Sequence, residues 1–219
     1  MDTLSKSSDT PERQAKRVIA FEGSRRIAAG DLQQVALKAK EVIDSHEWAS
    51  VLIFDDVTSE IIEVDLRGTV EDVLRRLGET AREEGAAVAP SASGPAESRG
   101  PGRPKLGVVA REVTLLPRHW EWLGHQPGGA SVALRKLVEE ARRTHASEDL
   151  ARQAREAAYR FMSATAGNEP GFEEATRALF GGDRTRFNEM IESWPQDVRD
   201  QAQKLAAVTF GGQPAEAGA

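Results

Sequence analysis

The chain has 219 residues, of which 39% are hydrophobic, 29% charged and 5% aromatic, which is typical of a globular protein with aliphatic, alanine-rich cores. It contains no cysteine, which excludes disulfide bonds, thiolate chemistry and cysteine-ligated metals. Its formal net charge is −6, and no segment approaches the ~20 apolar residues that span a bilayer, so we expect a cytoplasmic protein that is neither secreted nor membrane-inserted.

The first folded segment is predicted over residues 17–80, behind a polar, disordered stretch at 1–16. Two apolar runs on either side of Gly23 predict a pair of short strands. Asp31 is a suitable helix cap, and apolar residues recur behind it at three- and four-residue steps. This spacing predicts an amphipathic helix that ends near Asp44.

The second half of this segment predicts two more strands and a helix. Apolar runs at 51–54 and 61–66 indicate the strands, and the run Asp55-Asp-Val-Thr-Ser59 between them indicates a turn. The helix is predicted from apolar residues at helical spacing, namely Val70, Val73, Leu74 and Leu77. The resulting order, β-β-α-β-β-α, is typical of a small α+β domain with one sheet covered by helices.

A linker is predicted over residues 81–106. Between Gly85 and Gly102 almost every residue is Gly, Ala, Pro or Ser. Such a composition buries too little apolar area to offset the entropy of ordering the chain, so we expect this segment to be disordered.

Charge is distributed unevenly along the chain. From Arg99 to His145 there are nine basic and four acidic residues, a net charge of +5, whereas the remaining residues carry a net charge of −11. An acidic protein with a basic centre can hold a polyanion at that centre while repelling it elsewhere.

The segment 107–145 predicts one strand at 108–116 and two helices at 117–124 and 131–144. A lone strand leaves its backbone groups unpaired, so it requires a partner chain. Pro117 suits the first position of a helix, the glycines at 128 and 129 suit a turn, and Ser131 can cap the second helix.

The run Gly107-Val-Val-Ala-Arg-Glu-Val-Thr-Leu-Leu-Pro, together with the two helices behind it, resembles a ribbon-helix-helix module. The resemblance implies a homodimer in which one strand from each chain forms an antiparallel ribbon in the major groove of DNA. If Leu116 packs inward, then Arg111, Val113 and Leu115 face the groove, and of these only Arg111 can form bidentate hydrogen bonds to guanine.

This module supplies the predicted site residues. The expected DNA contacts are Arg111, Val113, Arg118, Ser131, Arg135 and Lys136. The expected dimer core consists of Leu116, Trp120, Leu123, Leu134, Leu137 and Val138.

The preceding residues, Arg99-Gly-Pro-Gly-Arg-Pro-Lys105, resemble an AT-hook. The resemblance implies that Arg103 enters the minor groove of an A·T tract while Arg99 and Lys105 hold phosphates. The alternative interpretation is a basic, proline-stiffened end of the linker.

The remaining chain predicts a helical tail at 146–210 and a disordered end at 211–219. Apolar residues recur at helical spacing and are interrupted at Gly167, Pro170, Gly181 and Pro195. We expect this tail to be the part of the chain that offers a surface to a protein partner.

Catalysis finds little support in the sequence. His119 and His125 are six residues apart, which does not place them on one helix face. Asp55, Asp56 and Glu60 suit a hairpin turn better than a metal site. We therefore expect no enzyme activity, cofactor or metal.

Taken together, the runs Leu52-Ile-Phe-Asp-Asp, Asp65-Leu-Arg-Gly and Pro170-Gly-Phe-Glu-Glu-Ala resemble an uncharacterised bacterial family known as a domain of unknown function. The resemblance implies a bacterial cytosolic protein. Our prediction is a homodimer that binds double-stranded DNA, as a transcriptional regulator or a nucleoid-associated factor. Two alternatives are a homo-oligomeric assembly protein that does not bind DNA, and an enzyme in the N-terminal domain.

Overall fold

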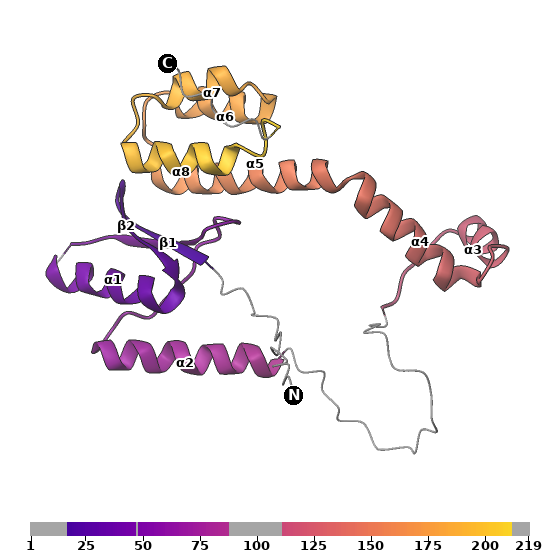
Figure 1. Cartoon of the computed structure of the whole chain (residues 1–219), viewed down its shortest axis with the longest axis horizontal. Helices are drawn as coiled ribbons and strands as arrows, with labels where there is room; N and C mark the ends of the chain where they lie inside the picture. Colours follow the sequence, from indigo (N-terminus) through magenta and orange to yellow (C-terminus); the bar gives the residue numbers. More distant parts are fainter. Residues whose placement is uncertain (1–16, 47, 88–110, 212–219) are drawn as a thin grey trace, which may run out of the picture. The chain divides into compact units, whose positions relative to one another are not determined.

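The computed structural model describes residues 17–46, 48–87 and 111–211 (Figure 1). None of the helices in these ranges has the length and apolarity needed to cross a membrane. The elements within the described ranges are β1 (Arg17–Glu22), β2 (Arg25–Asp31), α1 (Leu32–Ser45), β3 (Val51–Asp55), α2 (Val70–Ala87), α3 (Pro117–Gly124), α4 (Gly129–Thr144), α5 (Ala146–Thr165), α6 (Phe172–Gly181), α7 (Arg184–Ile191) and α8 (Gln196–Ala206).

These elements form two compact units, which we describe separately. The sheet unit consists of the described residues within Met1–Arg82 and Leu150–Ala219, and the central unit of those within Glu83–Asp149. The sheet unit thus joins two segments that are far apart in the sequence.

The sheet has the strand order β2-β1-β3, with both pairings antiparallel. Strands β1 and β2 are joined at Gly23, whose φ of +57° is a conformation that glycine adopts without a steric penalty. Every residue of β1 from Val18 to Phe21 is buried. Because successive side chains of a strand point to opposite faces, this continuous burial means that the sheet is covered on both sides.

Helix α1 covers one face. It begins behind Asp31, whose carboxylate accepts a hydrogen bond from the Gln34 amide at 3.0 Å, so the predicted cap is confirmed. Its apolar stripe packs against the sheet in a cluster that contains Val18, Ala20, Val35, Ala39 and Ile53.

The tail helices pack in one hydrophobic core with the other face of the sheet. Phe161 of α5 is fully buried, and its ring centroid lies 5.1 Å from that of Phe21 and 5.4 Å from that of Phe54. On strand β2, the Arg26 amide donates a hydrogen bond to the carboxylate of Asp197 on α8 at 2.8 Å. The helical tail and the N-terminal sheet therefore share a single core.

The predicted fourth strand at 61–66 is wrong. Ile61 forms one isolated bridge with Phe54, and the rest of the segment is not a strand. The guanidinium of Arg76, on α2, donates hydrogen bonds to the carbonyl oxygens of Asp65 and Arg67. The predicted alternation is nevertheless present, because Ile62, Val64 and Leu66 pack against the core of α1 while the acidic residues between them are exposed. The carbonyl oxygen of Asp65, which a strand would pair with a neighbour, is thus held by a side chain instead.

Helix α2 extends to Ala87, into the segment expected as linker, and its first turn carries a reciprocal capping box. The Thr69 amide donates to the Asp72 carboxylate at 3.1 Å, and the Asp72 amide donates to the Thr69 hydroxyl at 3.3 Å. The first of these hydrogen bonds is the largest cause that lowers the pKa of Asp72 below its ordinary value. The ionised form of Asp72 therefore stabilises the start of α2.

Replacing Thr69 with alanine is expected to lower the free energy of unfolding by about 1 kcal/mol, because α2 loses its N-terminal cap. A carboxyl whose pKa is depressed on folding stabilises the fold above its unfolded pKa, and this contribution is lost as the pH falls through the folded value. The alanine variant keeps the Thr69 amide bond to Asp72 and loses the hydroxyl contact, so the difference between the two proteins should shrink in part as Asp72 is protonated. Urea unfolding in a pH series that descends from neutral measures both effects.

Thr80→Ala is the matched control, because among the described residues the Thr80 hydroxyl bonds to the Arg76 carbonyl of the same helix and to nothing else. An equal loss in the Thr80 variant would contradict the capping role of Thr69.

Candidate functional site

The two helices of the central unit begin and end as their local signals indicate. Helix α3 has Pro117 at its first position and ends at Gly124, which matches the predicted range. The turn at Gly128 and Gly129 is confirmed, since both residues have positive φ angles, of 86° and 75°. A Cβ atom at Gly128 would lie 3.1 Å from the Val132 side chain, so this position is also sterically restricted to glycine.

The prediction that Ser131 caps α4 is wrong. Helix α4 begins at Gly129, two residues earlier than predicted, with Gly128 as its cap and no side-chain hydrogen bond there. Gly128 and Gly129 both adopt the left-handed backbone conformation that the turn requires, so the helix begins directly at Gly129. Ser131 lies inside the first turn, exposed, where its carbonyl accepts a hydrogen bond from Arg135 Nε at 3.0 Å.

The central unit leaves most of its large apolar side chains in solvent. Among its described residues, only Leu123 and Ala133 are buried apolar residues. Of the predicted dimer core, Leu123 is buried and Leu134 is partly covered. The large apolar side chains of this unit that are 44–55% exposed are Val113, Leu116, Trp120, Trp122, Leu137 and Val138. We call this set the apolar surface of the central unit.

The segment before α3 joins no sheet of the described chain. Arg111–Leu116 is neither helix nor strand, and none of the β1, β2 or β3 pairings includes it. Leu116 has an extended backbone (φ −66°, ψ 150°). The first part of the predicted strand, residues 108–110, lies outside the described residues, as do Arg99, Arg103 and Lys105 of the AT-hook-like motif.

The predicted DNA contacts that the structure describes are all exposed. Arg111, Arg118 and Lys136 have no hydrogen-bond or ion-pair partner among the described residues. The guanidinium of Arg135 is held against its own helix by the bond to Ser131. Arg142, near the end of α4, forms an ion pair with Glu139 at 2.9 Å.

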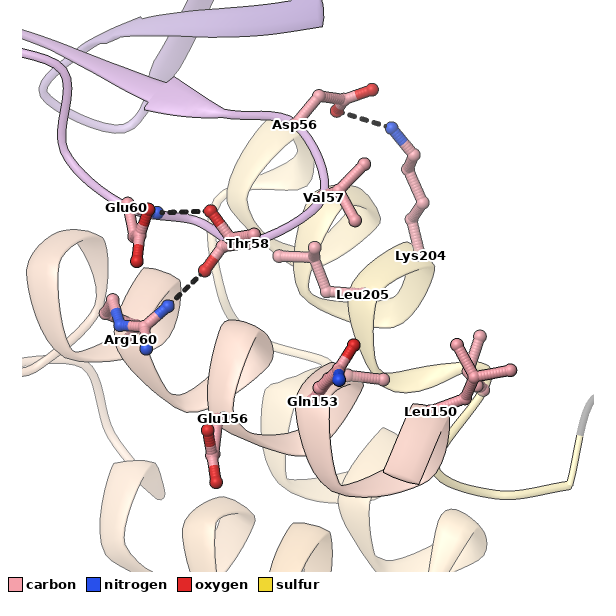
Figure 2. A pocket seen from close by; sticks show the side chains of 12 residues that line it. Asp56, Val57, Thr58, Glu60, Leu150, Gln153, Glu156, Arg160, Lys204 and Leu205 are labelled. Atoms are coloured by element: carbon pink, nitrogen blue, oxygen red, sulfur yellow. Dashed lines mark hydrogen bonds and ion pairs between the residues drawn. The ribbon is translucent and has the colours of Figure 1, made fainter. Parts of the chain in front are cut away.

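A pocket of about 400 Å³ opens on the sheet unit (Figure 2). Its walls come from the loop after β3, from α5 and from the end of α8. Asp55 fixes this loop, because its buried carboxylate accepts hydrogen bonds from the amides of Val57 at 2.9 Å and Thr58 at 2.8 Å. The turn predicted at 55–59 is confirmed by this arrangement.

The loop is tied to both helices by cationic side chains. The Lys204 ammonium of α8 lies 2.6 Å from the Asp56 carboxylate, and Arg160 of α5 donates a hydrogen bond to the Thr58 carbonyl (Figure 2). The Glu60 and Glu156 carboxylates, which also line the pocket, have no partner among the described residues.

The sequence prediction identified the loop residues as a turn and missed the pocket. Arg160 and Lys204 are ordinary exposed positions of predicted helices, and no spacing links them to residues 56–60. Only the packing of the tail on the sheet brings them together. In the described ranges, no group of three His, Asp or Glu side chains could hold a metal ion.

The chain matches the model of one protein family. The model of a family described as "Uncharacterized protein conserved in bacteria (DUF2239)" matches residues 17–206, which include residues of both units. No match was found among curated proteins or among solved structures.

Proposed function

The chain belongs to this conserved bacterial family, and we propose that it is a homodimeric DNA-binding protein whose central unit pairs with that of a second copy. The observation that carries the proposal is the apolar surface of the central unit. Two short helices that bury only Leu123 and Ala133 have too little core to be stable alone.

A second copy is the occupant that fits this surface best. Homodimers with two-fold symmetry use the same patch on both subunits, so apolar residues on α3 and α4 can cover their own counterparts. Leu116 and Val113 extend the surface into the segment before α3, whose backbone can pair with the same segment of the partner. This is the arrangement that the resemblance to a ribbon-helix-helix module implies.

Charge supports DNA as the ligand of the dimer. The net charge of +5 between Arg99 and His145 is doubled in a dimer, and it is concentrated beside the proposed ribbon. The exposed side chains of Arg111, Arg118 and Lys136 are available to phosphates or bases because no carboxylate of the described residues pairs with them. The start of α4 adds backbone amides that suit a phosphate oxygen. In this proposal Arg111 reads the major groove and Arg103 the minor groove of A·T-rich DNA.

The proposal is tested by DNA binding at two salt concentrations. A dimer that neutralises ~6 phosphates should lose about a thousandfold in affinity for an A·T-rich duplex between 50 and 200 mM salt. Fluorescence anisotropy measures the affinity, and sedimentation at micromolar concentration measures the mass. A monomer at that concentration would contradict the proposal.

Neutralising α4 should weaken this binding without changing the dimer. The double variant Arg135→Gln and Lys136→Gln removes two charges from each chain, both exposed. We expect the slope of log affinity against log salt to fall by about three to four, at ~0.9 per phosphate contact in a dimer. Lys38→Gln, which removes an exposed charge on α1 of the sheet unit, is the control and should leave the slope unchanged.

A specific observation favours a second candidate, an assembly protein that does not bind DNA. On α4, Glu139 binds Arg142 through its carboxylate and Arg143 through its carbonyl oxygen, which reduces the positive field of that helix end. A stable dimer that forms no salt-sensitive complex with DNA would support this candidate.

A further inference from the structure

We propose that the pocket of the sheet unit binds a small amphipathic cation, of the alkylammonium class. The pocket combines apolar walls with two carboxylates that have no partner within residues 17–46, 48–87 and 111–211, and it adjoins a pair of exposed aromatic rings. Each of these three features favours one part of such a ligand.

The walls suit an alkyl chain. Leu150 of α5, Leu205 of α8 and Val57 of the loop line the pocket (Figure 2). Ala154 of α5 and Val208, just after α8, complete its apolar lining. Val57 and Leu150 are 75% and 58% exposed, so apolar surface remains in water beside a concave site. Such surface is a common mark of a binding site, because covering it is favourable.

The charges in the pocket favour a cation. Both cationic side chains already have partners there, Lys204 with Asp56 and Arg160 with the Thr58 carbonyl. The groups left without a partner among the described residues are the carboxylates of Glu60 and Glu156. The five ionisable lining residues carry a net charge of −1. An anion would have to displace an existing contact, whereas an ammonium group would not.

A pair of aromatic side chains next to the pocket also favours an ammonium group. A second pocket, of about 390 Å³, shares Glu156 and Arg160 with the first and is also lined by Tyr159 and Phe180. The two rings are half exposed and lie edge to face, with centroids 5.7 Å apart. Aromatic faces next to a carboxylate attract ammonium groups, above all quaternary ones, through the ring quadrupole.

The loop that forms one wall is held in a fixed conformation. Ser59 has a φ of +54°, and it is the one residue other than glycine with a positive φ in the described ranges. Its side chain is almost fully buried, next to the Asp55 turn and the two contacts to α5 and α8. A ligand therefore meets a preformed site and does not have to order the loop.

The test compares three probes of equal chain length on the full chain, namely hexyltrimethylammonium, hexanol and hexanoate, with dissociation constants from NMR titration. We expect the cation to bind at least tenfold more tightly than hexanoate, with hexanol between them. Equal or tighter binding of hexanoate would overturn the proposal, and so would the absence of saturable binding of the cation.

Two variants locate the site. Glu156→Gln should weaken binding of the cation by about two- to fivefold, the usual effect of losing an exposed opposite charge, and should leave the affinity for hexanol unchanged. Glu79→Gln, an exposed glutamate on α2, is the matched control and should bind as the unaltered chain does. Melting temperatures without a probe show that each variant is folded. An unchanged affinity of the folded Glu156 variant would overturn the proposal.

Discussion

Replacing Leu137 and Val138 with aspartate is expected to convert the proposed dimer into a monomer and to abolish salt-sensitive DNA binding. Both side chains lie on α4 in the apolar surface of the central unit and are about half exposed in the single chain. In a monomer the aspartate side chains are exposed to solvent and cost little stability. In a dimer the same substitutions place four unpaired carboxylates in the interface.

The size of the effect follows from the area that remains to be covered. Full burial of a Leu or Val side chain contributes about 1.5–3 kcal/mol, so four half-exposed side chains contribute about 3–6 kcal/mol to the dimer. This loss alone raises the dimer dissociation constant on the order of 10²- to 10⁴-fold, since 1.4 kcal/mol is a factor of ten. The cost of burying the new charges adds to it.

Sedimentation equilibrium over a range of concentrations measures the change, and anisotropy with the A·T-rich duplex follows DNA binding. Val57→Asp is the matched control, because Val57 is an exposed valine of the sheet unit. We expect that variant to remain dimeric. If the α4 variant stayed dimeric with its affinity unchanged, this face of α4 would not be the interface.

Helix starts and turns could be predicted from the sequence where a single residue determines the backbone conformation. Asp31 caps α1, Pro117 opens α3, and the glycines at 128 and 129 form the turn before α4. Each acts through its own hydrogen bond or φ angle, so no tertiary information is needed.

Signals that depend on distant partners were harder to interpret. The alternating pattern of 61–66 fits an extended segment with one buried face, but it does not show that the segment leaves the sheet after Ile62 or that Arg76 binds the carbonyl oxygen of Asp65. The continuous apolar run from Val18 to Phe21 does indicate a strand that is covered on both faces. It does not identify the second cover, which is supplied by helices near the other end of the sequence.

The apolar surface of the central unit is a different case. The sequence predicts Trp120, Leu137 and Val138 as core residues from their helical spacing, and in the single chain these side chains are exposed. The spacing therefore predicts an apolar face that the described residues of the chain leave exposed, and the proposed function assigns its cover to a second copy. Sedimentation and DNA-binding measurements test whether a second copy covers this face.

Replacing Phe161 with alanine is expected to lower the free energy of unfolding by about 3–5 kcal/mol, the usual cost of removing a fully buried phenylalanine. Phe161 contacts Phe21 of β1 and Phe54 of β3, so the cavity would open between the sheet and α5. Because most domains have a total stability of only 5–15 kcal/mol, such a loss would leave the sheet unit marginally stable.

Urea unfolding followed by two probes tests whether the two segments of the sheet unit unfold together. The chain has four tryptophans, and Trp48, Trp120 and Trp122 are replaced with phenylalanine in the protein used for this test. Trp194, which is buried between α7 and α8, then reports by fluorescence on the tail, while circular dichroism reports on all helices. We expect both transitions to shift to lower urea by the same amount in the Phe161 variant. Tyr159→Ala, two residues away on α5 and half exposed, is the control and should cost far less. A loss below about 1 kcal/mol in the Phe161 variant would mean that the aromatic cluster does not join the sheet to the tail, because a shared core cannot lose its central ring at so small a cost.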